Sequence, residues 1–209
     1  MTRKPLSWIV TGESMAADAS VFFTLWLQKP LRIAAANSSS GRLADAMAAQ
    51  VDLARPGPTG ELGAGTGSLT RELIRAGRPP ERVIALEREP GLAEILRRKL
   101  HGLTVIQGNA ERIVQHPAIR ADQLSTVVSS LPIKWFLLAA QEVAVRPSLD
   151  RLGVGGRFIQ LINAFRSRLV MRRLGIVGCE VARVWFNLLP AQIWCYWEAR
   201  RSFEGGKAL

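Results

Sequence analysis

Apolar positions follow two spacings along the chain, and their alternation predicts the order of its elements. Short continuous apolar runs, such as 82–87 and 124–130, are separated by segments with helical spacing, such as 68–77 and 136–150. Continuous apolar runs are typical of strands buried on both faces of a parallel sheet, with helices covering those faces. From residue 55 onwards the pattern therefore predicts an α/β fold.

The individual elements can be placed from the same pattern. We expect strands ending at residue 62 and over 82–87, 103–107, 124–130, 155–163, 177–186 and 191–199. We expect helices over 68–77, 90–100, 110–115, 136–150 and 164–174. A turn at Leu188-Leu189-Pro190 joins the last two strands, so they must pair antiparallel. The sequence predicts a seven-stranded, mostly parallel sheet with a C-terminal antiparallel hairpin and helices on both faces.

The first 54 residues differ from the rest, and we expect them to form a helical extension before a domain over 55–209. A helix over 14–29 carries apolar side chains around most of its surface, so it is either buried or inserted into a lipid interface. Ser39 or Ser40 caps a second helix that runs to about residue 51, and Pro and Gly residues at 55–58 end it. No window reaches the roughly 20 apolar residues of a membrane-spanning helix.

The charge balance narrows the range of partners. The chain has 28 Lys and Arg residues against 17 Asp and Glu, a formal net charge of +11. An excess of this size favours an anionic partner, either a polyanion or an anionic membrane surface. A solvated excess without function is the alternative, and charge alone does not choose between lipid and nucleic acid.

A glycine-rich segment, Glu61-Leu62-Gly63-Ala64-Gly65-Thr66-Gly67, lies between an expected strand and an expected helix. Glycine permits positive φ angles and a close approach of ligand and backbone. The Lys-Ser/Thr of a phosphate loop does not follow, and the third glycine comes one position too early for a dinucleotide-binding motif. With the acid before it, the segment resembles the first motif of class I S-adenosylmethionine (SAM) dependent methyltransferases.

Three later segments agree with this resemblance. Glu87 ends the next strand, where a carboxylate can accept both ribose hydroxyl hydrogens. Gln107-Gly108-Asn109-Ala110 ends the third strand, and residues 152–158 resemble the late Gly-Gly turn of the family. The resemblance implies SAM as cofactor, S-adenosylhomocysteine as product, and no metal. The expected cofactor contacts are Glu61, Gly63, Gly65, Thr66, Gly67, Glu87, Arg88, Asn109, Ala110, Ser129, Ser38 and Ser39.

The segment expected to face the methyl group is Ser129-Ser130-Leu131-Pro132-Ile133, at the end of the fourth strand. It resembles the Asn-Leu-Pro-Tyr motif of ribosomal RNA adenine dimethyltransferases and the Ser-Ser-Leu-Pro motif of bacterial phospholipid N-methyltransferases. Base methylation uses an aromatic residue after the proline to stack the flipped base, and Ile133 does not stack. The RNA family also has a helical C-terminal domain, for which we expect no residues here. Both differences favour the lipid family.

Further segments resemble the bacterial phosphatidylethanolamine N-methyltransferases: 22–31, 38–39, 41–44, 79–83, 184–191 and 194–196. The resemblance implies transfer of up to three methyl groups to phosphatidylethanolamine, towards phosphatidylcholine. Residues 161–166 depart from the family near the acceptor pocket, so another aminolipid, such as an ornithine lipid, is an alternative acceptor. Two competing hypotheses are an enzyme like the RNA adenine dimethyltransferases and a non-catalytic SAM-binding protein.

Methyl transfer to an amine needs positioning and desolvation more than a strong base. We expect catalytic contacts from Ser129, Ser130 and Tyr196, although core packing is the alternative for Tyr196. Contacts to the acceptor or the membrane are expected from Leu131, Pro132, Asn163, Arg166, Arg168, Arg172, Arg173, Phe22, Phe23, Trp26 and Lys29. For the helix over 14–29, packing over the SAM pocket as a lid is the alternative to insertion into the membrane. We expect a monomer or weak oligomer on the inner face of the cytoplasmic membrane, with an anionic lipid surface and no nucleic acid as partner.

Overall fold

The computed structural model describes residues 37–117, 119, 123–133, 138–163, 171–186 and 189–199. By its internal contacts the chain divides at Ala34, and all of these residues belong to the unit Ala35–Leu209. The expected helix over 14–29, with Phe22, Phe23, Trp26 and Lys29, lies outside the described residues, and so do Arg166 and Arg168.

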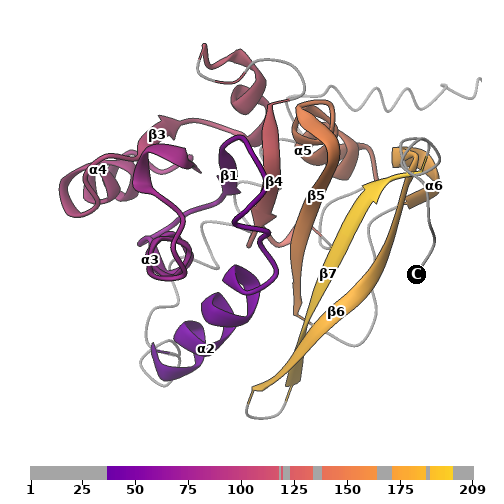
Figure 1. Cartoon of the computed structure of the whole chain (residues 1–209), viewed down its shortest axis with the longest axis horizontal. Helices are drawn as coiled ribbons and strands as arrows, with labels where there is room; N and C mark the ends of the chain where they lie inside the picture. Colours follow the sequence, from indigo (N-terminus) through magenta and orange to yellow (C-terminus); the bar gives the residue numbers. More distant parts are fainter. Residues whose placement is uncertain are drawn as a thin grey trace, which may run out of the picture. The chain divides into compact units, whose positions relative to one another are not determined.

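Among the described residues, seven strands form one sheet in the order β3-β2-β1-β4-β5-β7-β6 (Figure 1). The pairs from β3 to β5 are parallel, whereas β7 runs antiparallel to both β5 and β6. This arrangement confirms the predicted fold class. The strands are β1 (Thr59–Leu62), β2 (Val83–Glu87), β3 (Thr104–Gln107), β4 (Leu124–Ser129), β5 (Leu152–Asn163), β6 (Ile176–Phe186) and β7 (Leu189–Glu198).

Helices cover both faces of the sheet, because successive residues of a strand point to opposite faces. Val127 of β4 belongs to a core cluster with residues of η3, α5 and α6, whereas Val128 belongs to a second cluster with α2 and α3. Leu96 of α4 packs against Ala85 of β2. The helices are α2 (Asn37–Ala48), α3 (Ser68–Arg75), η2 (Pro80–Arg82), α4 (Pro90–Lys99), η3 (Ala110–Gln115), α5 (Leu138–Leu149) and α6 (Met171–Leu174).

Helix α2 is part of the α/β core, which corrects the expected boundary at residue 54. Met47 and Ala48 are buried in one cluster with Leu73 of α3 and Ile159 of β5. The apolar face of α2 is therefore occupied by the sheet. Ser39 and Ser40, expected at the helix cap, lie inside α2 instead.

The C-terminal hairpin has a shorter turn than the sequence pattern suggested. Leu189 and Pro190 belong to β7, where Pro190 pairs with Trp185 of β6. Pairing between β5 and β7 ends at Asn163 and Ala191. Pro190 thus lies just past the paired part of β5, where its missing N–H removes no hydrogen bond to that strand.

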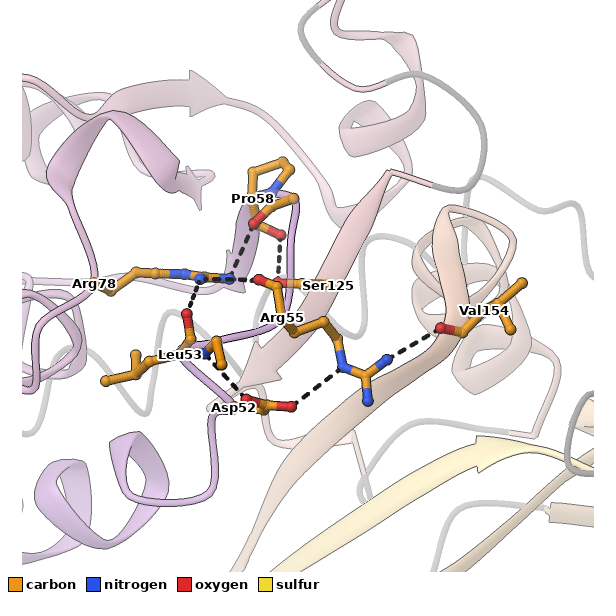
Figure 2. A network of polar contacts seen from close by, with 9 residues as sticks. Asp52, Leu53, Arg55, Pro58, Arg78, Ser125 and Val154 are labelled. Carbon is orange, nitrogen blue, oxygen red and sulfur yellow. Dashed lines mark hydrogen bonds and ion pairs between the residues drawn. The ribbon is translucent and has the colours of Figure 1, made fainter. Parts of the chain in front are cut away.

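A buried arginine, which the sequence pattern did not reveal, joins the amino ends of β1 and β4 (Figure 2). Arg78 is 1% exposed and donates to the hydroxyls of Thr59, at 2.8 Å, and Ser125. It also donates to the carbonyl oxygens of Leu53, Arg55 and Gly57. Burial lowers the pKa of Arg78, and these five acceptors replace the water that the guanidinium has lost.

No helix in the described parts of the chain has the length and apolar character needed to cross a bilayer.

Candidate functional site

The loop between β1 and α3 is held in a conformation that depends on glycine. Gly63, Gly65 and Gly67 have φ angles of 76°, 57° and 81°, in the region where a side chain would be strained. The amides of Gly63 and Ala64 both donate to the carbonyl oxygen of Leu86, at 2.9 and 3.1 Å. The loop therefore bends from the end of β1 towards the end of β2. Thr66 within it is exposed.

Glu87, the last residue of β2, binds the glycine loop through its carboxylate. Its Oε2 accepts from the amide of Gly65 at 2.8 Å, and its Oε1 accepts from the amide of Glu89 at 2.9 Å. Glu87 is 1% exposed, while its neighbour Arg88 is exposed. A carboxylate has about four lone-pair sites, so both oxygens keep acceptor capacity for a ligand.

Glu61 on β1 is fully buried below the same loop. Its Oε2 accepts from the hydroxyl of Thr70 at 2.7 Å, whereas its Oε1 has no hydrogen-bond partner among the described residues. Burial raises the pKa of Glu61 to about 7, the Thr70 hydrogen bond opposes this, and the nearby charge of Glu87 adds to it. A buried carboxyl oxygen of this kind is an available acceptor for a cationic or hydrogen-bonding ligand.

The ends of β1 and β4 meet where the strand order reverses, which is where open α/β sheets bind ligands. The hydroxyl of Ser130 donates to the carbonyl oxygen of Gly63 at 2.9 Å. A Cβ atom on Gly63 would lie only 2.6 Å from Cδ2 of Leu131, so a larger residue there would require the Leu131 side chain to shift. The structure thus brings the glycine loop together with the expected acceptor segment, in which Leu131 and Pro132 are half-buried.

Gln160 on β5 belongs to this site, although no motif pointed to it. It pairs with Ser129 of β4 and is 2% exposed. Its Nε2 donates to the carbonyl oxygens of Leu131 and Leu161, at 2.9 and 2.8 Å. A polar residue within the apolar run 158–162 was the only sequence signal that could have identified it.

The end of β3 joins the same edge of the sheet. The amide of Gly108 donates to the carbonyl oxygen of Glu87 at 2.9 Å. Asn109, which precedes η3, is exposed, and Ala110 is half-buried. These residues therefore follow Glu87 around the carboxyl edge, in the order that the sequence predicted. Ser38 and Ser39 lie in the first turn of α2, and their side chains lie outside the described residues.

Tyr196 lies in the core, which corrects its place among the catalytic candidates. It is fully buried in the larger core cluster and pairs with Phe158. Its ring stacks on Trp194, with 6.0 Å between the centroids. Its partner Phe158 comes two residues before Gln160, the register partner of Ser129. Tyr196 therefore lies farther from the carboxyl edge than Ser129 does. The surroundings of Tyr196 are those of a packing residue.

Arg172 and Arg173 were expected beside the carboxyl end of β5, and the structure places them elsewhere. Arg173 forms an ion pair with Glu142 of α5, with 2.9 Å between its Nε and the carboxylate Oε1. Ile176, just after α6, pairs with Glu198, whereas Asn163 at the end of β5 is opposite Ala191. Glu198 and Ala191 are seven residues apart along β7, so the start of β6 and the end of β5 are about 23 Å apart. Arg172 and Arg173 therefore do not flank the expected acceptor segment.

Comparison with solved structures identifies the fold. A 1,6-didemethyltoxoflavin-N1-methyltransferase from Burkholderia thailandensis, solved with S-adenosylhomocysteine, superposes with a TM-score of 0.64 over 94% of this chain and 93% of its own, at 16% identity. The glycopeptide N-methyltransferase MtfA, solved with SAM, gives 0.58 over 76% of this chain and 94% of its own, at 17% identity. The fold is that of the class I methyltransferases. At these identities the likeness concerns the fold alone.

One relative is similar in sequence as well. An ornithine lipid N-methyltransferase from Singulisphaera acidiphila is 34% identical over 105 residues. The match covers 48% of this chain and 55% of the relative, so the chain spans about half the length of the curated relative it matches. No family model matches the chain.

Proposed function

We propose that this protein transfers methyl groups from SAM to the amine of a membrane aminolipid. The observation that carries the proposal is the switch point, where a glycine loop, two buried carboxyl groups and the Ser129–Pro132 segment meet in a methyltransferase fold. The sequence similarity to an ornithine lipid N-methyltransferase supports an aminolipid as acceptor.

The residues at the switch point fit SAM. Around the Cβ position of Gly65 no atom lies within 4 Å, so the backbone there is open to a ligand. The free Oε1 of Glu61 suits the ammonium group of the cofactor, and the remaining lone pairs of Glu87 suit its ribose hydroxyls. When bound, SAM supplies an activated methyl group on a sulfonium. Glu61 would be ionised by that positive neighbour, since an opposite charge lowers a carboxyl pKa.

The similarity favours ornithine lipid over phosphatidylethanolamine, which the sequence motifs had suggested first. Both headgroups carry an alkyl amine with a pKa near that of Lys, about 10.4, so the reactive neutral form is scarce at pH 7. The residues that line the strand ends must therefore exclude water and orient the amine. Ser130 and Leu131, which join the acceptor segment to the glycine loop, would set that orientation.

We propose that the protein attaches to an anionic membrane surface, and its net charge of +11 supports this. We place the protein on the inner face of the cytoplasmic membrane, as a monomer or weak oligomer without a nucleic-acid partner. The expected contacts of Phe22, Phe23, Trp26 and Lys29 with lipid, and those of Arg166 and Arg168, stay predictions.

The test offers radiolabelled SAM and the full chain to vesicles that contain ornithine lipid, phosphatidylethanolamine or neither, and in a parallel reaction to ribosomal RNA. We expect label in the ornithine lipid, with phosphatidylethanolamine as the second acceptor. Glu61→Gln should weaken SAM binding about tenfold in calorimetry, because it removes a charge-assisted contact. A variant with the exposed Glu94 of α4 changed to Gln is the matched control. Label in ribosomal RNA alone, with a steep dependence on salt, would instead identify a nucleic-acid methyltransferase.

A further inference from the structure

Ser129, at the end of β4, and Gln160, its register partner on β5, have polar side-chain atoms that no described residue satisfies. Ser129 is fully buried and Gln160 is 2% exposed. Neither the hydroxyl oxygen of Ser129 nor the Oε1 of Gln160 has a hydrogen-bond partner among the described residues. A buried polar atom without a partner costs stability, so a native protein that keeps two of them side by side calls for an explanation.

The orientation of the Gln160 amide follows from its neighbours. Its Nε2 donates to two carbonyl oxygens, those of Leu131 and Leu161. Turning the amide over would place Oε1 against both of these oxygens, which only accept hydrogen bonds. The free atom of Gln160 is therefore an acceptor. The bond to Leu131 also places the amide beside the segment that faces the methyl donor in the proposed function.

Ser129 and Gln160 are register partners on adjacent parallel strands, so their side chains are on the same face of the sheet. Neighbouring strands lie about 4.8 Å apart. Two acceptors on the same face of neighbouring strands are suited to the two hydrogens of one neutral primary amine. From the other side, β7 places Trp194 opposite Gln160, and Trp194 is itself buried. The aromatic side chain of Trp194 therefore lies on the same face of the sheet as the Gln160 amide.

Unpartnered hydroxyls also occur elsewhere in the described structure, on Thr126 of β4 and Ser148 of α5. A single buried hydroxyl is therefore not diagnostic. Thr126 pairs with Thr59 at the amino end of β1, whereas Ser129 pairs with Leu62 at its carboxyl end. Ser148 lies in the last turn of α5. What distinguishes Ser129 and Gln160 is that they are paired, and that they lie at the carboxyl edge beside Leu131.

We propose that the Ser129 hydroxyl and the Gln160 amide oxygen bind the two N–H groups of the acceptor amine and so direct its lone pair at the methyl group. This inference rests on the proposed function and names the residues that recognise the amine. In the transfer the nitrogen lone pair forms the N–C bond while the C–S bond breaks and sulfur keeps its electron pair. The resulting ammonium then loses a proton to water.

The proposal makes the benefit of these residues depend on the methylation state of the acceptor. A neutral primary amine has two N–H groups, its monomethyl form has one, and its dimethyl form has none. Ser129 and Gln160 can therefore assist the first transfer fully, the second in part and the third not at all. A residue that only stabilised the fold would affect all three transfers equally.

The experiment measures kcat/KM of the full chain with unmethylated, monomethyl and dimethyl forms of ornithine lipid and of phosphatidylethanolamine in mixed micelles. The variants are Ser129→Ala and Gln160→Met. The control is Ser148→Ala, which makes the same chemical change at a buried hydroxyl away from the carboxyl edge. Ser129→Ala breaks no hydrogen bond of the described structure, so we expect it to fold normally. Thermal unfolding and calorimetric binding of S-adenosylhomocysteine monitor the fold of every variant.

The quantity compared is the kcat/KM for the unmethylated form divided by that for the dimethyl form. We expect this ratio to fall roughly threefold to tenfold in Ser129→Ala and in Gln160→Met, because each variant removes one neutral hydrogen bond to the amine. The ratio should not change in Ser148→Ala. Gln160→Met also removes the hydrogen bond to the carbonyl oxygen of Leu131, so we expect it to lower kcat/KM for all three acceptor forms. This common decrease cancels in the ratio. Equal losses for all three acceptor forms would overturn the inference and leave the proposed function intact. A wild-type chain that binds SAM but methylates none of these lipids would overturn both.

Discussion

Buried side chains at the amino ends of β1 and β4 differ in their hydrogen bonding from those at the carboxyl ends of the same strands. At the amino ends, the hydroxyls of Thr59 and Ser125 both accept from the guanidinium of Arg78. At the carboxyl ends of the same strands, Oε1 of Glu61 and the hydroxyl of Ser129 have no partner among the described residues. The two ends are only a few residues apart, and all of these side chains are buried.

This difference separates polar groups that stabilise the fold from groups that a ligand can complete. Buried hydrogen bonds that are fully made contribute to stability, whereas an unmade one has a cost that persists until a partner arrives. We therefore expect changes at the amino ends to lower stability. Changes to the unpartnered groups at the carboxyl ends, Glu61 and Ser129, should alter ligand binding, with little or even favourable effect on stability.

The largest expected effect is that of Arg78→Met, which leaves two hydroxyls and three carbonyl oxygens without their donor (Figure 2). We expect the free energy of unfolding to fall by about 4 kcal/mol, because each buried acceptor that loses its donor keeps an uncompensated desolvation cost. Urea unfolding followed by circular dichroism measures it. Arg98→Met, at an arginine whose side chain is 70% exposed and whose partner Glu94 is exposed too, is the control and should change it by less than about 0.5 kcal/mol. Equal midpoints for both variants would contradict the stabilising role of Arg78.

Glu61→Gln should have the opposite effect on stability. The folded-state pKa is about 7 and the ordinary value is 4.5, so the folded protein binds more protons between these pH values. Wild-type stability therefore falls as the pH rises from about 4.5 to 7, by up to about 3 kcal/mol. The ligand-free variant should lack this decrease and be more stable than wild type above pH 7. Parallel pH profiles of unfolding in the two proteins would rule out a buried, titrating Glu61.

Two glycines of the loop should differ in the cost of an added methyl group. Gly63→Ala places Cβ 2.6 Å from Leu131, and its φ of 76° is strained as well, so we expect a loss of about 2 kcal/mol in unfolding free energy. Gly65→Ala meets no atom within 4 Å and has only the strain of its φ, about 1 kcal/mol. Calorimetry should nevertheless show weaker SAM binding in Gly65→Ala, since its methyl group enters the open space. Unchanged affinity there would move the ligand away from Gly65.

The smallest expected effect belongs to Ser130→Ala, which removes the 2.9 Å hydrogen bond from the end of β4 to the carbonyl of Gly63. We expect a loss of about 1 kcal/mol in unfolding free energy. The affinity for S-adenosylhomocysteine should fall about fivefold, because the loop is then less ordered before binding. Chemical unfolding and calorimetry on the same preparation measure both quantities. A loss of stability without any loss of affinity would show that this hydrogen bond does not shape the ligand site.

Local signals account for what the sequence predicted well. The succession of strands and helices from β1 to β5 follows from apolar runs separated by helical segments, and the glycine loop and Glu87 follow from their positions at strand ends. The burial of Arg78 and the place of Gln160 gave no comparable signal. Both depend on residues far away in the sequence: Arg78 bonds to Ser125, and Gln160 to Leu131.

The errors in the sequence-based prediction also arise from contacts between residues far apart in the sequence. The apolar face of α2 could have met lipid or protein, and only the packed sheet shows that it meets Leu73 and Ile159. Tyr196 and Arg173 were placed by their order along the chain, whereas pairing within the hairpin put one in the core and the other beside Glu142. Periodicity tells which face of an element is buried but not what covers it.

The sequence by itself determined the class of fold, the position of the switch point and the glycine and carboxylate chemistry there, because each depends on neighbouring residues in one strand or turn. The tertiary structure alone decided which buried polar groups are satisfied. Arg78 completes the amino ends of β1 and β4, while Glu61, Ser129 and Gln160 keep open acceptors at the carboxyl edge. Hydrogen-bond satisfaction is a property of distant groups brought together by packing, and a linear pattern does not contain it.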